Sequence, residues 1–397
     1  MACIGIYGVR QLRDQEDIHN QCLSKNQKEC IKALNQLRNN ISSLANKQKT
    51  WNDLIKLTNN KDRWVKVEAV STIGYAFPHM PDKQKAWNDL IKLTNDEDSD
   101  VRSKAASAIG SAFFHVPDKQ KAWNDLHKLT NDEDSDVRYR AASVIGSTLS
   151  HVPDKQKAWN DLIKLKNNED RRVRVEAVSA LDSAFYDVPD KQKAWNDLIK
   201  LTNDKDSDVK YRAASVLGSA FPHVPDKQKA WNDLIKLTND ENSDVRYRAV
   251  SAIDSAFFHV PDKQKAWNDL HKLKNNEDWW IRSRIASAIG SAFFHVPDKQ
   301  KAWNDLIKLM AWNDLIKLTN DEDNDEDSDV RSKAASAIGS AFFHVPDKQK
   351  AWNDLIKLTN DKDKWVRSRI ASAIGSAFFH VPDKQKAWND LIKLTND

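Results

Sequence analysis

Cysteine and long apolar runs are scarce in this sequence, and each shortage excludes a class of protein. The 397 residues include only three cysteines, Cys3, Cys22 and Cys30, and their spacing matches no metal-binding or redox motif. We therefore expect free thiols in a reducing compartment. No apolar stretch approaches the length of about 18 residues that a membrane-spanning helix needs, and the opening residues lack the leader of a signal peptide. The sequence predicts a soluble cytoplasmic protein with no membrane contact.

A surplus of charge of one sign is also missing. The 62 basic and 58 acidic residues leave a formal charge of +4, which gives no whole-protein signature of polyanion binding, although a local stripe is compatible with it. A nucleophile with its base, a distinctive carboxylate pair and a glycine-rich phosphate loop are absent too. Aspartate and lysine abound, but in identical copies, whereas a catalytic constellation should occur once. We predict a non-enzymatic protein with no catalytic residues, no cofactor and no metal.

A repeat is what the sequence has in abundance. The stretch PDKQKAWNDLIKLTND recurs along most of the chain, and its tryptophans lie 36 residues apart at Trp51, Trp87, Trp123, Trp159, Trp195, Trp231, Trp267 and Trp303, and again at Trp352 and Trp388. A fixed period of this length is typical of a solenoid, in which each unit packs only on its neighbours.

Each unit reads as two helices joined by an acidic turn. The first is expected from about Pro81 to Thr94, with an apolar stripe of Ala86, Trp87, Leu90, Ile91 and Leu93. The second is expected to be capped by Ser99 or Asp100 and to bury one side that carries Val101, Ala105, Ile109, Ala112 and Phe113. Such a hairpin cannot bury its apolar stripes alone, so neighbouring copies must stack.

The segment LIKLTNDEDSDVRSKAASAIG resembles the HEAT-repeat family, in particular the short HEAT-like repeats of the phycobilisome-lyase type. The pattern of leucines, D-x-D and V-R-x-x-A-A-x-A-L-G matches residues 90–110, and it recurs nine times. The resemblance implies an all-α fold, a right-handed α-solenoid of stacked αα-hairpins. It also implies that the second helices line the concave side. The loop aspartates and the arginines after the valines are implied to form a ladder between units, so we interpret those arginines as structural.

The domain organisation follows from the repeat. Residues 1–50 are expected to form a divergent N-terminal helical cap, and residues 51–397 an array of nine helix pairs plus a final lone helix. Between Trp303 and Trp352 the array carries 13 extra residues, near 310–327. A second copy of AWNDLIKL rotates the apolar stripe by about half a turn. We therefore predict either a break near Met310 or a projecting helix end, followed by an acidic loop from Asn320 to Asp329.

Function is expected where the copies disagree, around the start of the second helix. We predict a scaffold that binds a protein partner of unknown identity on the concave face. The candidate contact residues are Trp64, Trp280, Trp365, Tyr139, Arg140, Tyr211, Arg212, Tyr247, Arg248, Arg284 and Arg369. Nucleic-acid binding through the basic and tyrosine-bearing positions is an alternative. Self-assembly through the solenoid ends, giving a homo-oligomer, is another. Histidines that recur at the end of the second helix, such as His115 and His151, are read as partners of the helix dipole rather than metal ligands.

Overall fold

Every regular element is a helix in the residues that the computed structural model describes, which are 20–21, 24, 26–44, 46–273, 278–316, 326–361 and 363–396. The first helices of the units are α3 (Lys47–Leu57), α5 (Lys83–Lys92), α7 (Lys119–Lys128), α9 (Lys155–Lys164), α11 (Lys191–Leu201), α13 (Lys227–Leu237), α15 (Lys263–Lys272), α17 (Lys299–Ile316), α19 (Lys348–Leu358) and α21 (Lys384–Asn396). The second helices are α2 (Gln27–Asn40), α4 (Arg63–Ala76), α6 (Ser99–Phe113), α8 (Ser135–Thr148), α10 (Arg171–Phe185), α12 (Ser207–Ala220), α14 (Ser243–Ala256), α16 (Trp279–Ala292), α18 (Glu326–Ala341) and α20 (Lys364–Ala377).

Aspartates start both kinds of helix. In the first helix, Asp82 is the N-cap and its carboxylate accepts a hydrogen bond from the Lys85 amide at 2.9 Å. Pro81 therefore lies outside the helix, and its predicted place in the first turn is wrong. The second helix is capped by Asp98, which accepts from the Asp100 amide at 2.9 Å. The prediction of Ser99 or Asp100 as the cap is wrong, because both already lie inside the helix.

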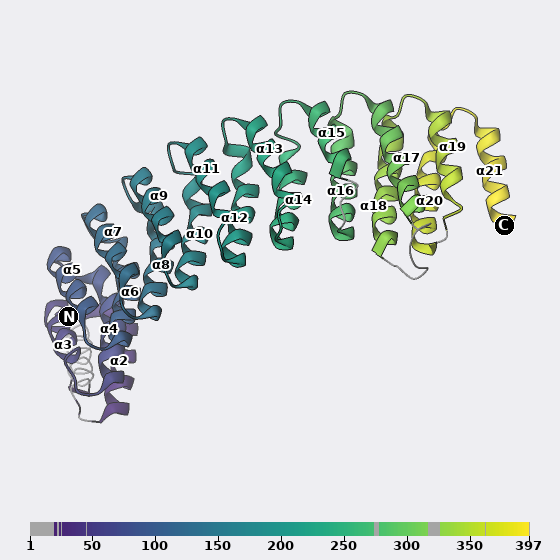
Figure 1. Cartoon of the computed structure of the whole chain (residues 1–397). Coiled ribbons are helices and arrows are strands. Elements are labelled where there is room, and N and C mark those ends of the chain that lie inside the picture. Colours follow the sequence, from purple (N-terminus) through teal and green to yellow (C-terminus); the bar gives the residue numbers. More distant parts are fainter. Residues whose placement is uncertain are drawn as a thin grey trace, which may run out of the picture. The chain divides into compact units, whose positions relative to one another are not determined.

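Alternate helices build the layers of the solenoid. The chain divides into two compact units, Met1–Asp197 and Leu198–Asp397, each of which holds several of the 36-residue repeats. We call them the first unit and the second unit. In the first unit the second helices α4, α6, α8 and α10 pack against one another in sequence order, and in the second unit α12, α14, α16, α18 and α20 do so (Figure 1). These stacked hairpins confirm the predicted all-α solenoid.

The core forms where first and second helices meet. The tryptophans of the repeat from Trp51 to Trp352 are all at most 1% exposed. Phenylalanines of the second-helix ends, such as Phe77 and Phe257, pack edge-on against them, with ring centroids about 6 Å apart. Burial of Val101, Ala105, Ile109, Ala112 and Phe113 confirms the predicted core side of the second helix. Ile91 and Leu93 are only half-buried, so the apolar stripe of the first helix is narrower than predicted.

The 13 extra residues leave the solenoid contacts in place. Helix α17 runs without interruption from Lys299 to Ile316, so the predicted break near Met310 is wrong. The repeated AWNDLIKL brings no glycine or proline, and its strong helix formers continue the helix despite the rotated stripe. Helix α18 begins at Glu326, so the predicted loop to Asp329 is too long. Residues 317–325 and the side chain of Trp312 lie outside the described residues.

Candidate functional site

The residues that are identical in every copy form contacts between neighbouring repeats. Eight indole Nε1 groups donate to the aspartate of the next WND motif at 3.0–3.4 Å. The pairs are Trp51–Asp89, Trp87–Asp125, Trp123–Asp161, Trp159–Asp197, Trp231–Asp269, Trp267–Asp305, Trp303–Asp354 and Trp352–Asp390. The asparagine of the motif accepts from a lysine of the next unit, for example Lys157 to Asn124 at 3.0 Å. The WND motif therefore holds neighbouring first helices in register.

A second ladder joins the acidic turns. Arg102 donates to both carboxylate oxygens of Asp132 at 3.0 Å and to the backbone carbonyl of Asp96 at 2.9 Å. Equivalent ion pairs are Lys66–Asp96, Arg138–Asp170, Lys210–Glu241, Arg246–Asp278 and Arg331–Asp361. These pairs confirm the ladder that the family resemblance implies, so the arginines are occupied within the fold.

The recurrent histidines pack on phenylalanines of the preceding unit. His151, His295, His344 and His380 meet Phe114, Phe258, Phe294 and Phe343 edge to face at 4.6–4.8 Å. The backbone carbonyls at this helix end accept hydrogen bonds from a lysine instead. Lys119, for example, reaches the carbonyls of Phe114 and Val116 at 3.1 Å. Within the part of the chain that the structure describes, no group of three or more His, Cys, Asp or Glu side chains is placed to hold a metal ion.

The positions at which the copies differ lie together on one side of the second helices, where all members but the buried Ser283 are exposed or half-buried. We call this the variable stripe. It comprises the residues equivalent to Asp244, Tyr247 and Arg248, which are spaced three and four apart and so share a helix face. Its members in the second unit are Asp208, Tyr211, Arg212, Asp244, Tyr247, Arg248, Trp280, Ser283, Arg284, Asp329, Ser332, Lys333, Trp365, Ser368 and Arg369. Its members in the first unit are Trp64, Val67, Glu68, Asp100, Ser103, Lys104, Asp136, Tyr139, Arg140, Arg172, Val175 and Glu176.

From α12 to α16 the stripe of the second unit is a stack of rings and guanidinium groups. Arg248 lies over the Tyr211 ring at 4.3 Å, and Arg284 lies over the Tyr247 ring at 5.0 Å. Arg284 also donates to the Tyr247 hydroxyl at 2.8 Å, and Trp280 meets the Tyr247 ring at 5.6 Å. Each contact joins a second helix to the next one, so side chains 33 or 37 residues apart fix each other's position.

Exposure divides the predicted contact residues. Trp64 and Trp365 are 59% and 68% exposed, whereas Trp280 is half-buried against Tyr247. Arg140, Arg212, Arg284 and Arg369 are exposed, and Tyr139, Tyr211 and Arg248 are half-buried. The structure thus brings Tyr211, Tyr247, Arg248, Trp280 and Arg284 into contact. Trp64 and Trp365 have only neighbouring cations, Arg63 and Lys364, over their rings.

A carboxyl group that sequence reasoning missed lies near the stripe. Asp254 lies in α14 at the repeat position that Gly339 occupies in α18. Burial raises the pKa of its carboxyl, an effect that the charge of Arg284 partly offsets. The signal was present in the sequence as an aspartate in a row of glycines. Its side chain occupies the place where other second helices touch, as at Gly339, where an added Cβ would lie 2.9 Å from the Ala373 Cβ.

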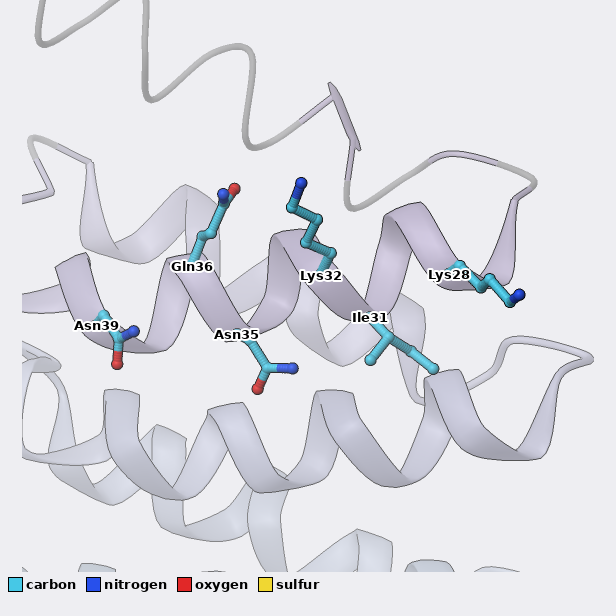
Figure 2. Close-up of a pocket in the computed structure, with 6 residues that line it drawn as sticks. All are labelled: Lys28, Ile31, Lys32, Asn35, Gln36 and Asn39. Carbon is cyan, nitrogen blue, oxygen red and sulfur yellow. The ribbon is translucent and has the colours of Figure 1, made fainter.

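One hollow of the surface has a volume of about 470 Å³ and is lined by Lys28, Ile31, Lys32, Asn35, Gln36 and Asn39, all from α2. Figure 2 shows these side chains spread along the helix and pointing in different directions. Among them Ile31 is half-buried. No helix within the described residues is long and apolar enough to cross a membrane.

The stacked helix pairs and their ladders define an α-solenoid repeat protein, and comparison with known families gives its kind. The family model for HEAT repeats matches residues 123–218 and 196–290, so this part of the chain is similar to HEAT repeats. No curated protein matches the chain. Among solved structures, Kap95p with RanGDP is 14% identical with a TM-score of 0.63 over 96% of this chain and 51% of that one. The Kap95:Nup1 complex is 16% identical with a TM-score of 0.62 over 96% and 52%, and yeast importin-beta (Kap95p) is 14% identical with a TM-score of 0.58 over 94% and 51%. This chain spans about half the length of those proteins, and the likeness shows the fold.

Proposed function

We propose that the protein is a non-enzymatic scaffold that binds a protein partner through the variable stripe, on the side of the second helices. One observation carries this proposal. Residues that are identical among the copies are used in contacts between neighbouring repeats, whereas the residues that vary among the copies lie on an exposed helix face. Packing explains the first group and leaves the second group available for recognition.

The chemistry of the stripe fits a protein interface. Tryptophan, tyrosine and arginine are the residues that carry most binding energy in such interfaces. Trp64, Trp365 and Tyr247 expose their rings, and Arg140, Arg212 and Arg369 expose their guanidinium groups. Solenoids present extended surfaces of this kind to their ligands. The similar Kap95 structures include complexes with RanGDP and with Nup1, which supports a protein as the partner.

The same proposal covers the organisation of the chain. We propose that residues 1–50 cap the repeat array of residues 51–397. Support comes from α2, which packs against α4 as the second helices pack against each other, with Arg38 4.8 Å from the centre of the Tyr75 ring. Cys30 is buried and forms no disulfide within the described residues, which fits the proposed cytoplasmic location.

Affinity capture with matched variants tests the function. The double variant Tyr247→Ala and Trp280→Ala removes the rings of the stripe, and Lys236→Ala with Lys272→Ala changes exposed positions on first helices. Partners are captured from lysate with nuclease at two salt concentrations and identified by mass spectrometry. We expect proteins that remain at high salt with the wild type and the first-helix variant and are lost with the stripe variant. Equal capture by all three proteins would remove the stripe as the binding surface.

A further inference from the structure

We propose that the variable stripe of the second unit binds an extended acidic protein segment that carries a carboxylate at about every third residue. This inference rests on the proposed function and names the chemistry of the partner. It assigns recognition to the five basic residues Arg212, Arg248, Arg284, Lys333 and Arg369, which occupy the same position on α12, α14, α16, α18 and α20.

The two units differ in charge at this position. The second unit has five cations there and no anion, whereas the first unit has Glu68, Lys104, Arg140 and Glu176. In the first unit Glu68 also binds Arg38, so part of that charge is neutralised within the fold. The whole chain is nearly neutral, and the concentration of like charge on one row is therefore a local property of the second unit.

The cations of the second unit are available to a ligand. Among the described residues, no carboxylate oxygen lies within ion-pair distance of any of the five basic groups. The ion pairs of this unit use the ladder residues, such as Arg246 with Asp278, instead. Nearby acids are Asp208, Asp244, Asp254 and Asp329; of these, Asp329 accepts a hydrogen bond from Ser283.

Stacking on tyrosine rings orders the side chains of Arg248 and Arg284 before a carboxylate binds. The rings of Tyr211 and Tyr247 hold the guanidinium groups of Arg248 and Arg284. A guanidinium group held by its face still offers the N–H donors of its edge, and this planar fork matches a carboxylate with two parallel hydrogen bonds. Because the side chains are already ordered, binding loses less conformational entropy than it would with free arginines.

The layer spacing sets the register of the ligand. Packed helices lie about 8–10 Å apart, and an extended chain advances about 3.3 Å per residue. A strand that crosses α12, α14, α16, α18 and α20 therefore passes from one cation to the next in about three residues.

Ring accessibility favours protein over nucleic acid. Single-stranded nucleic acids bind where bases can stack on free aromatic faces. Tyr247 already has Arg284, Arg248 and Trp280 around its ring, at 5.0, 5.9 and 5.6 Å, and Tyr211 carries Arg248 at 4.3 Å. The cations therefore remain for carboxylates, whereas the rings of Tyr211 and Tyr247 are partly covered by neighbouring side chains.

Fluorescence anisotropy with the full chain tests the proposal. The probe is a labelled peptide of about 15 residues with glutamate at every third position. The comparison peptide has the same composition with its glutamates in one block, and a single-stranded oligonucleotide of equal charge is the third probe. We expect the spaced peptide to bind best. The variant Arg248→Gln with Arg284→Gln should weaken that binding about tenfold or more, because two carboxylate contacts are lost.

Removal of equal charge from exposed positions of first helices is the control. The variant Lys236→Gln with Lys272→Gln changes α13 and α15, outside the stripe, and should leave the affinity for the spaced peptide unchanged. Circular dichroism shows whether each variant keeps the helical fold. Equal losses in both variants, or equal binding of the two peptides, would overturn the proposal in favour of unspecific attraction. Tighter binding of the oligonucleotide would overturn it in favour of a nucleic acid.

The capture experiment separates this proposal from the function on which it rests. If the spaced peptide does not bind but the stripe variant still loses captured proteins, the partner is a protein that is not acidic. If neither experiment depends on the stripe, the proposed function fails as well.

Discussion

At the scale of single residues, the contacts explain why some positions are identical in all copies. In the WND motif the tryptophan donates a hydrogen bond to the next repeat and the aspartate accepts one from the previous repeat, as Trp123 and Asp161 do at 3.2 Å. Asp161 also accepts from Lys157 and Lys164, and these hydrogen bonds, working against its burial, lower the pKa of its carboxyl. Any change at such a residue therefore disturbs two neighbouring units.

Replacement of one indole tests the tryptophan ladder. Trp123→Phe keeps an aromatic ring in the core but removes the donor to Asp161, which leaves a buried acceptor with one partner fewer. We expect a loss of about 1–3 kcal/mol in the free energy of unfolding, seen as a lower urea midpoint by circular dichroism. Trp388→Phe is the control, because Trp388 is 55% exposed and its ring contact with Phe378 suits phenylalanine too. Equal effects of the two variants would show that the hydrogen bond contributes little.

A histidine in a first helix predicts a pH dependence of stability. His127 occupies the position of Ile91, and burial lowers the pKa of its imidazole, while Asp161 raises it in part. A base whose pKa is lower in the folded state contributes its full stability above the ordinary pKa of about 6.5 and loses stability as the pH falls below it. His127→Ile should therefore raise the urea midpoint more at pH 5.5 than at pH 7.5, and its gain at neutral pH should be about 1 kcal/mol. A gain independent of pH would contradict this.

At the scale of helices, capping residues set where each helix begins, and glycine allows neighbouring second helices to approach closely. An added Cβ on Gly290 would lie 2.7 Å from the Ala337 Cβ and 3.4 Å from its Cα. The extra residues, which begin within α17, do not alter this contact between α16 and α18, nor the bond from Trp303 to Asp354 at 3.1 Å. The insertion thus lengthens α17 and leaves these contacts intact.

Two glycines at the same repeat position should respond to alanine in opposite directions. Gly290→Ala should destabilise the protein by about 1–3 kcal/mol, because the Ala337 backbone must move. Gly375→Ala should stabilise it by up to about 1 kcal/mol, because nothing lies within 4 Å of the added Cβ and alanine favours the helix. Thermal unfolding by circular dichroism measures both. A stabilising Gly290→Ala would show that α16 and α18 are less closely packed than described.

At the scale of the whole molecule, the contacts that hold the layers together join nearest neighbours. The indole bonds, the turn ion pairs and the histidine–phenylalanine contacts named above all run from one 36-residue repeat to the next. Stability in such an array is approximately a sum of unit and interface terms, so a local lesion should remain local.

Hydrogen exchange measures how far a lesion spreads. Trp123→Phe should speed amide exchange in α7 and α9, whose contact it weakens, and leave α18 and α20 at the wild-type rate. Exchange read by mass spectrometry on peptic fragments resolves these helices. Faster exchange throughout the chain would show that the array unfolds as one cooperative block.

The sequence could predict much of the fold and less of the site. Because the tryptophans recur every 36 residues and the apolar positions follow helical spacing, the helix pairs and most of the core are readable from local patterns. The helix starts were misplaced, because several aspartates lie within reach and only the backbone selects Asp82 and Asp98 as caps. The break near Met310 was mispredicted, because helix propensity outweighed the rotated apolar stripe.

By itself, the sequence determined that this chain is a repeated helical hairpin with variable residues on one helix face, because both properties depend on spacing within a single copy. The tertiary structure alone decided which residues of different copies meet. Trp123 reaches Asp161, 38 residues on, Arg102 reaches Asp132, 30 residues on, and Arg248 covers Tyr211, 37 residues back. These offsets differ because they depend on how far one layer is displaced against the next. That displacement arises from side-chain packing between copies, which no periodicity within the chain encodes.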